Sequence, residues 1–118
     1  MTKSDMTVRD KALAHFKSRL SGDLQKITVP EWDCEIYFRA TSSMATEAKI
    51  LKLTTDGKTA EALVESIVQK ALDAEGKKVF HESDRAMLMN ETDPAVLVRI
   101  ATALNNASAD SIEAVEKN

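Results

Sequence analysis

The first apolar residues of the chain recur at helical spacing. Leu13, Phe16 and Leu20 fall on one face of a helix. We expect this helix to begin after an N-cap at Thr7 and to end before Gly22. Basic residues surround the polar side of the pattern, so the helix is predicted to be amphipathic.

The period of the pattern changes to two around residues 27–38. Ile27 and Val29 alternate with polar neighbours, Pro30 interrupts the run, and the alternation then resumes. The apolar members of the second run are Trp32, Cys34, Ile36 and Phe38. This pattern predicts a short β-hairpin in which Cys34 is a small core residue rather than a nucleophile. Because an isolated hairpin is marginally stable in water, its apolar face must pack against helices or another chain.

Helical spacing returns after residue 42 and predicts two further helices. The first begins after Ser43 and ends at residues 54–57, and its apolar stripe is Met44, Ala48 and Leu51, broadened by Ile50 and Leu53. The second has a wide apolar face, formed by Ala60, Leu63, Val64, Ile67, Val68 and Ala71. Its polar side should face solvent and consists of Glu61, Glu65, Gln69 and Asp73.

The last third of the chain predicts a short helix from Arg85 to Met89 and a longer one that opens at Asp93-Pro94. The core face of the longer helix is Val96, Leu97, Ile100, Ala101 and Leu104, and Asn105-Asn106 is its expected end. Residues 107–118 are small, polar and weakly patterned, which indicates a mobile or weakly helical tail. The predicted fold class is therefore mainly α: one helical domain over residues 1–106, with about five helices and one β-hairpin near residues 27–38.

Composition narrows the classes of protein that remain. A length of 118 residues fits a single domain, and one cysteine cannot form an internal disulfide. No apolar run approaches the roughly 20 residues of a membrane span, and the N-terminus has no apolar signal core, which indicates a cytosolic protein. The net charge of -3 comes from interspersed basic and acidic residues, whereas a nucleic-acid surface needs a basic stripe. We expect neither a membrane nor a nucleic acid as partner.

Residues 72–90 combine an acidic turn, one glycine and two lysines. On the calcium-binding helix-loop-helix template, Lys78 stands at the glycine position and Asp84 at the glutamate position, so the ligand set fails. One glycine cannot build a phosphate-binding loop either. The segment is predicted to be a reversing corner in which Gly76 takes a positive φ and Val79-Phe80 folds back into the core. We expect no metal and no cofactor.

Catalytic side chains do not converge in the sequence. His15 and His81 are far apart, and neither has a nearby cysteine or a motif serine. Glu31, Asp33 and Glu35 alternate as a solvated strand face does, rather than forming an acid/base pair. We therefore predict that the protein is not an enzyme.

Several short motifs follow one another in a characteristic order. They are Val29-Pro30-Glu31-Trp32, Ile36-Tyr37-Phe38-Arg39, Thr41-Ser42-Ser43, Leu72-Asp73-Ala74-Glu75-Gly76-Lys77-Lys78-Val79-Phe80 and Leu104-Asn105. In this order, residues 27–106 resemble the tail assembly chaperones of long-tailed, siphovirus-type bacteriophages. The motifs are structural, and no catalytic signature accompanies them.

The resemblance implies a non-enzymatic protein of the host cytoplasm that is absent from the mature virion. Such a protein binds the tape measure protein, keeps that long apolar chain soluble and hands it to tail tube subunits. The resemblance also implies self-association and a longer product made by ribosomal frameshifting. A generic helical adaptor or regulatory subunit fits the composition equally well. A transcriptional regulator would need a basic recognition helix, whereas the best-patterned helix carries Glu61 and Glu65 on its polar side.

Partner contacts are expected at two apolar clusters. The hairpin should leave an unpaired edge for another copy of the chain, and we expect the contact at Phe38-Arg39 and on the exposed flank of the helix over residues 60–71. Methionines crowd the short helix near residue 88 too densely for all to face a core, and flexible thioethers suit varied helical partners. The candidate partner-binding residues are Trp32, Ile36, Phe38, Met87, Leu88 and Met89.

Overall fold

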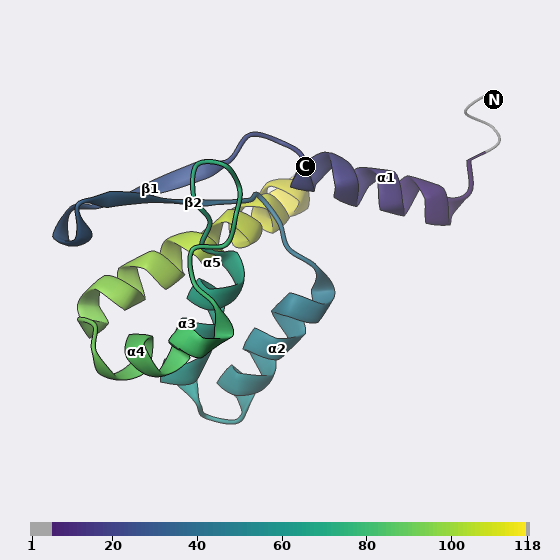
Figure 1. Cartoon of the computed structure of the whole chain (residues 1–118). Helices are drawn as coiled ribbons and strands as arrows, with labels where there is room; N and C mark the ends of the chain where they lie inside the picture. Colours follow the sequence, from purple (N-terminus) through teal and green to yellow (C-terminus); the bar gives the residue numbers. More distant parts are fainter. Residues whose placement is uncertain (1–5, 118) are drawn as a thin grey trace.

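The computed structural model describes residues 6–117, with side chains up to residue 106, and confirms a mainly helical fold with one β-hairpin (Figure 1). Its elements are α1 (Val8–Leu20), β1 (Gln25–Val29), β2 (Cys34–Phe38), α2 (Met44–Thr55), α3 (Thr59–Lys70), α4 (Arg85–Asn90) and α5 (Pro94–Lys117). Two short 3₁₀ segments, Pro30–Trp32 and Glu82–Asp84, lie between β1 and β2 and before α4.

Helix α3 is the centre of the molecule. It packs against α2, α4 and α5, and the hairpin lies along α5 through β1 (Figure 1). The buried cluster consists of Val29, Ile36, Phe38, Val64, Ile67, Val68, Ala71, Leu88, Val96, Leu97, Ile100, Ala101 and Leu104. All five residues predicted to form the core face of α5 are in this cluster, so that prediction is confirmed.

The two strands pair antiparallel, with Ile27 opposite Ile36. Because side chains alternate between the faces of a strand, the face that carries Ile36 and Phe38 packs into the core. The opposite face carries an ion pair between Lys26 and Glu35, 2.8 Å apart. The prediction that Cys34 is a core residue was wrong, because Cys34 is exposed. It is the first residue of β2 and pairs with Val29, which takes the buried position at this end of the hairpin.

The outer edge of β2 is partly covered by the chain itself. Tyr37 N–H donates to the Leu72 carbonyl over 2.9 Å, and Leu72 N–H donates back to the Tyr37 carbonyl over 2.7 Å. The Arg39 side chain is also engaged, because its Nη1 donates to the Leu20 carbonyl over 2.8 Å. The edge expected to be open near Phe38-Arg39 is therefore covered at Tyr37 by Leu72, which follows α3.

Helix α1 begins where the sequence predicted. Thr7 Oγ1 accepts from the Asp10 N–H, and Asp10 Oδ2 accepts from the Thr7 N–H, which closes a capping box. The helix buries no residue completely, and it projects from the body of the molecule (Figure 1). Only its end is fixed to the body, where Arg19 Nη2 donates to the Ala40 carbonyl over 3.2 Å and Leu20 is half-buried.

The corner at residues 72–80 follows the predicted chemistry in most respects. Gly76 has a φ of +82°, and the Asp73 carboxylate accepts from the N–H groups of Glu75 and Lys77 over 2.9 and 3.0 Å. A Cβ at Gly76 would stand 2.8 Å from the Arg39 guanidinium, so both backbone and space favour glycine there. The expectation that Val79 folds into the core was wrong, since it is 41% exposed.

The apolar residues predicted to form one stripe on α2 lie in two environments. Met44 is 80% and Leu51 65% exposed, while Ile50 and Leu53, expected to broaden the stripe, are half-buried. Helix α5 does not end near Asn105, because its backbone continues to Lys117. The expected mobility of the C-terminal segment stays a prediction.

Candidate partner-binding surfaces

A groove of about 780 Å³ lies between α2, α3 and α4. Leu53, Val64 and Met89 contribute apolar surface to it, and charged side chains of both signs line the rest. Met89 is 43% exposed, so its flexible thioether stands open to a partner. An amphipathic helix laid in the groove would meet apolar surface at Leu53, Val64 and Met89 and charged side chains on either side.

The wall of this groove contains an ion pair between a buried glutamate and a half-buried arginine that the sequence pattern did not predict. Glu65, expected to face solvent, is 6% exposed. Its Oε2 accepts from Arg85 Nε over 2.9 Å and from Arg85 Nη2 over 2.6 Å, and its Oε1 accepts from Gln69 over 3.2 Å. The solvated position inferred for Glu65 was wrong because α4 covers this side of α3 and supplies the matching cation.

On the side away from this groove, α2 presents an apolar stripe to solvent. Met44, Ala48 and Leu51 are spaced by four and three residues, so they share one face of the helix. All three are exposed in the isolated chain. Large exposed apolar side chains that share one face mark a contact site more often than scattered ones do.

A smaller apolar groove of about 150 Å³ lies where α3, α4 and α5 meet. Leu63, Met89 and Val98 are among its lining residues, and Val98 is 48% exposed. The lining residues Ala60, Thr92 and Pro94 are each next in sequence to an exposed carboxylate. These carboxylates are Glu61, Glu91 and Asp93.

A third cavity, of about 320 Å³, separates the end of α1 from the start of α2. Lys70, whose side chain is 8% exposed, closes one side of it. Its Nζ lies 2.8 Å from Glu47 Oε2 and also donates to Asn105 Oδ1 over 2.8 Å. Ser42 donates a short hydrogen bond to the same Glu47 oxygen. These bonds join α2, α3 and α5 through one lysine.

The Glu47 carboxylate should make the fold sensitive to acid. Burial raises its pKa, but the hydrogen bonds from Lys70 and Ser42 outweigh burial and hold the pKa below the ordinary value of 4.5. A lowered folded-state pKa contributes stability above the unfolded-state value, and this contribution is lost as the pH falls through the folded value.

We therefore expect Glu47→Gln to lower the free energy of unfolding by roughly 0.5–1 kcal/mol at pH 7, with the difference shrinking below pH 4.5. Urea unfolding of both proteins between pH 7 and 4 measures this. Glu75→Gln, at a side chain 77% exposed, is the matched control. A pH-independent difference would contradict the expected linkage.

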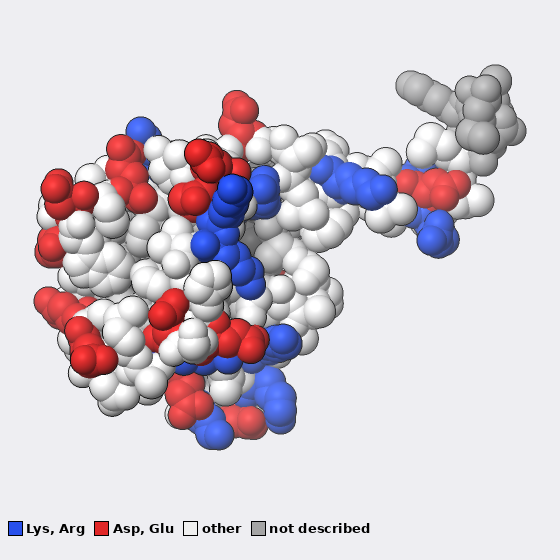
Figure 2. Space-filling view, in the orientation of Figure 1, with Lys and Arg blue, Asp and Glu red and all other residues white. Residues whose placement is uncertain are grey.

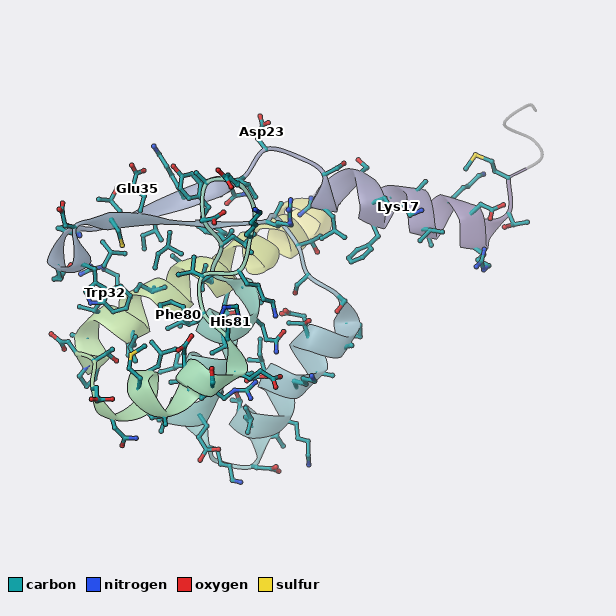
Figure 3. The ribbon with its side chains drawn as sticks, in the orientation of Figure 1. Lys17, Asp23, Trp32, Glu35, Phe80 and His81 are labelled. Atoms are coloured by element: carbon teal, nitrogen blue, oxygen red, sulfur yellow. The ribbon has the colours of Figure 1, made fainter. Side chains whose placement is uncertain are left out.

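The hairpin turn is held to the body by two contacts of different kinds. Trp32 meets Phe80 edge to face, with ring centroids 6.5 Å apart and planes at 75° (Figure 3). On the outside, Arg99 donates to both oxygens of Glu31 over 2.5 and 2.9 Å, and these bonds lower the pKa of Glu31 to about 2. Both contacts join segments that are far apart in the sequence.

The structure places the six candidate partner-binding residues in different environments. Ile36, Phe38 and Leu88 belong to the buried core, with at most 6% exposed. Trp32 and Met87 are half-buried and pack against that core, while Met89 is 43% exposed. Partner binding by these residues stays a prediction, and Met89 is the one of the six with an open side chain. The exposed apolar stripe of α2 adds Met44 and Leu51 to the candidates.

Charge is distributed unevenly over the visible face (Figure 2). Acidic side chains gather at the end of the molecule that holds the hairpin turn and the start of α5, whereas basic side chains lie along α1 and over the middle. Within the described residues, no three histidine, cysteine or carboxylate side chains come together as metal ligands would. In the same part of the chain, no helix is long and apolar enough to cross a membrane.

These features define a small helical domain with a hairpin laid along its last helix and open apolar surfaces on α2 and α4. The solved structure of the bacteriophage HK97 tail assembly chaperone has the same fold, with a TM-score of 0.55 and 14% sequence identity. The alignment covers 80% of this chain and 95% of the HK97 chain. The resemblance to tail assembly chaperones is thus confirmed at the level of the fold. No family model matches the sequence, and no curated protein matches it at a significant level.

Proposed function

We propose that this protein is a non-enzymatic tail assembly chaperone of a long-tailed bacteriophage. The observation that carries the proposal is the fold, because the structural alignment covers 95% of the HK97 tail assembly chaperone chain. The motif order in residues 27–106 supports the same family through a separate observation. In this role the protein acts in the host cytoplasm during tail assembly, and it is not retained in the mature virion.

The proposed client is the tape measure protein, which the chaperone keeps soluble until tail tube subunits assemble around it. A long apolar helical chain needs a partner that covers its apolar face, and grooves between helices bind amphipathic helices in this way. The groove between α2 and α4, lined by Leu53 and Met89, and the exposed stripe on the other side of α2, with Leu51, together offer such a surface. Copies of the chaperone are proposed to associate with one another along the client.

Charged substitutions on this surface should abolish the chaperone effect. We expect Leu51→Asp combined with Met89→Asp to reduce the amount of soluble co-expressed tape measure protein about tenfold, because a carboxylate at each apolar contact costs affinity. Val79→Asp is the matched control, since Val79 is similarly exposed, at 41%, and lies on the corner before α4. The readout is soluble tape measure protein in the cleared lysate, with folding of each variant checked by circular dichroism.

Two outcomes would contradict different parts of the proposal. An unmodified chain that leaves the tape measure protein insoluble would remove the proposed function. A folded double variant that works as well as the unmodified chain would remove this surface but not the function. A generic helical adaptor, the alternative, should show no complex with a tape measure fragment in gel filtration.

A further inference from the structure

Helix α1 is an arm that projects from the body, and its described contacts with the body lie in its C-terminal half, at Phe16, Arg19 and Leu20 (Figure 1). Its 13 residues carry four basic side chains and one carboxylate, a net charge of +3 with His15 neutral. A helix this short is marginal in water without tertiary contacts. The part beyond the anchored end therefore gains stability if another surface covers it.

One face of this arm has the form of a docking face. Arg9, Leu13 and Lys17 recur every four residues, so they form one line along the helix. Leu13 is 43% exposed, and a cation stands one turn away on each side of it. The complementary surface would be an apolar recess flanked by carboxylates.

The groove of about 150 Å³ between α3, α4 and α5 has this form. Its lining is almost wholly apolar. Glu61 lines the adjoining larger groove, which shares Val64 and Met89 with this one. The exposed Glu91 and Asp93 flank Thr92, a lining residue of the small groove, in sequence. The volume is sufficient for one leucine side chain. The arm cannot reach the groove of its own chain, because α1 and the start of α5 lie at opposite ends of a molecule 54 Å long (Figure 1).

We infer that Leu13 of one copy inserts into the α3–α4–α5 groove of a second copy. Arg9 and Lys17 then lie against the carboxylates that border the groove. The contact is heterologous, since the donor and acceptor surfaces differ, and it therefore continues from copy to copy as an open chain or closes as a ring. This inference rests on the self-association included in the proposed function, and it names the two surfaces.

Charge reversal on each side separately, followed by mixing, tests the contact. The first variant carries Arg9→Glu and Lys17→Glu, and the second carries Glu61→Lys and Glu91→Lys. Each variant alone places like charges on the arm and on the groove, so its dissociation constant should rise about tenfold. In an equimolar mixture each arm meets a groove of opposite charge, and association should return. Sedimentation velocity at low and high salt measures all three samples.

A matched pair of substitutions separates docking from folding. Leu13→Asp should raise the dissociation constant about tenfold, whereas His15→Asp, at an exposed position about 200° around the same helix, should leave it unchanged. Mixed variants that do not associate, or Leu13→Asp that associates like the unmodified chain, would overturn the inference. Tape measure solubility is measured on the same variants. If they keep the client soluble while remaining monomeric, the contact between copies is dispensable and the proposed chaperone function still stands.

Discussion

Replacing Arg85 with alanine should lower the free energy of unfolding by about 3 kcal/mol, because it leaves the Glu65 carboxylate buried without its cation. Glu65 is 6% exposed, and both hydrogen bonds from the guanidinium go to its Oε2. Gln69 would remain as a donor to the other oxygen, 3.2 Å away. One neutral amide does not replace two charge-assisted bonds in a desolvated site.

The chain provides its own control for this experiment. Arg99→Ala removes a guanidinium that also bridges to one glutamate, Glu31, but both partners of that pair are almost half exposed. Solvent screens such a pair, so the change in stability should be far smaller than for Arg85→Ala. Urea unfolding of the two variants at pH 7 gives the comparison. Equal losses would show that burial of Glu65 is not what makes its ion pair matter.

A second variant distinguishes the contribution of the two charges to stability from that of the packing of the Glu65 and Arg85 side chains. Glu65→Leu together with Arg85→Met replaces both charges by apolar groups of similar volume, and such replacements are often neutral or stabilising. We expect the double variant to recover most of the stability lost in Arg85→Ala. If it is as unstable as the single variant, the loss comes from packing or from the backbone of α4.

The helices that form the core could be predicted because their apolar residues are closely spaced and all lie on one face of the helix. Five positions of α5, from Val96 to Leu104, leave one possible inner face, and the structure buries all of them. Helix α2 has two apolar sides, one with Met44 and Leu51 and one with Ile50 and Leu53. It packs chiefly on α3, which can cover one side, and periodicity alone does not say which.

The buried ion pair could not be predicted for a related reason. Glu61 and Glu65 occupy equivalent positions on the polar side of α3, yet the first is exposed and the second is buried. The difference is the position of Arg85, 20 residues further along the chain. No local sequence pattern shows that Arg85 will lie next to Glu65, because this contact depends on how the corner at Gly76 redirects the chain. The corner itself was predictable from glycine and aspartate, whose local chemistry dictates the turn.

The partner surfaces were the least predictable part of the molecule. A sequence pattern marks which side chains are apolar, but partner binding depends on those that remain exposed after folding. Of the six candidates, Ile36, Phe38 and Leu88 are buried in the core of the chain itself. Met44 and Leu51, which fit the same apolar pattern, are the ones left open.

The edge-to-face contact between Trp32 and Phe80 holds the hairpin turn against the corner after α3. Trp32→Ala should lower the free energy of unfolding by about 3 kcal/mol, because a large side chain that packs against the core is lost. Phe80→Ala removes the partner ring, 6.5 Å away. Because an edge-to-face aromatic pair is worth roughly 0.5–1.5 kcal/mol beyond the burial of its area, the double variant should lose less than the two single losses combined.

Thermal and urea unfolding of the four proteins in this double-mutant cycle measure the coupling between the two rings. Trp32→Phe is the conservative control, since it keeps an aromatic ring in the turn and should recover part of the loss. An unchanged melting temperature for Trp32→Ala would contradict the packed position of the indole and would leave Trp32 available to a partner. A large loss with no coupling to Phe80→Ala would mean that Trp32 stabilises the turn through the core and not through Phe80. A large loss with positive coupling is the expected result, because the ring of Phe80 is the contact through which the corner after α3 holds the hairpin turn.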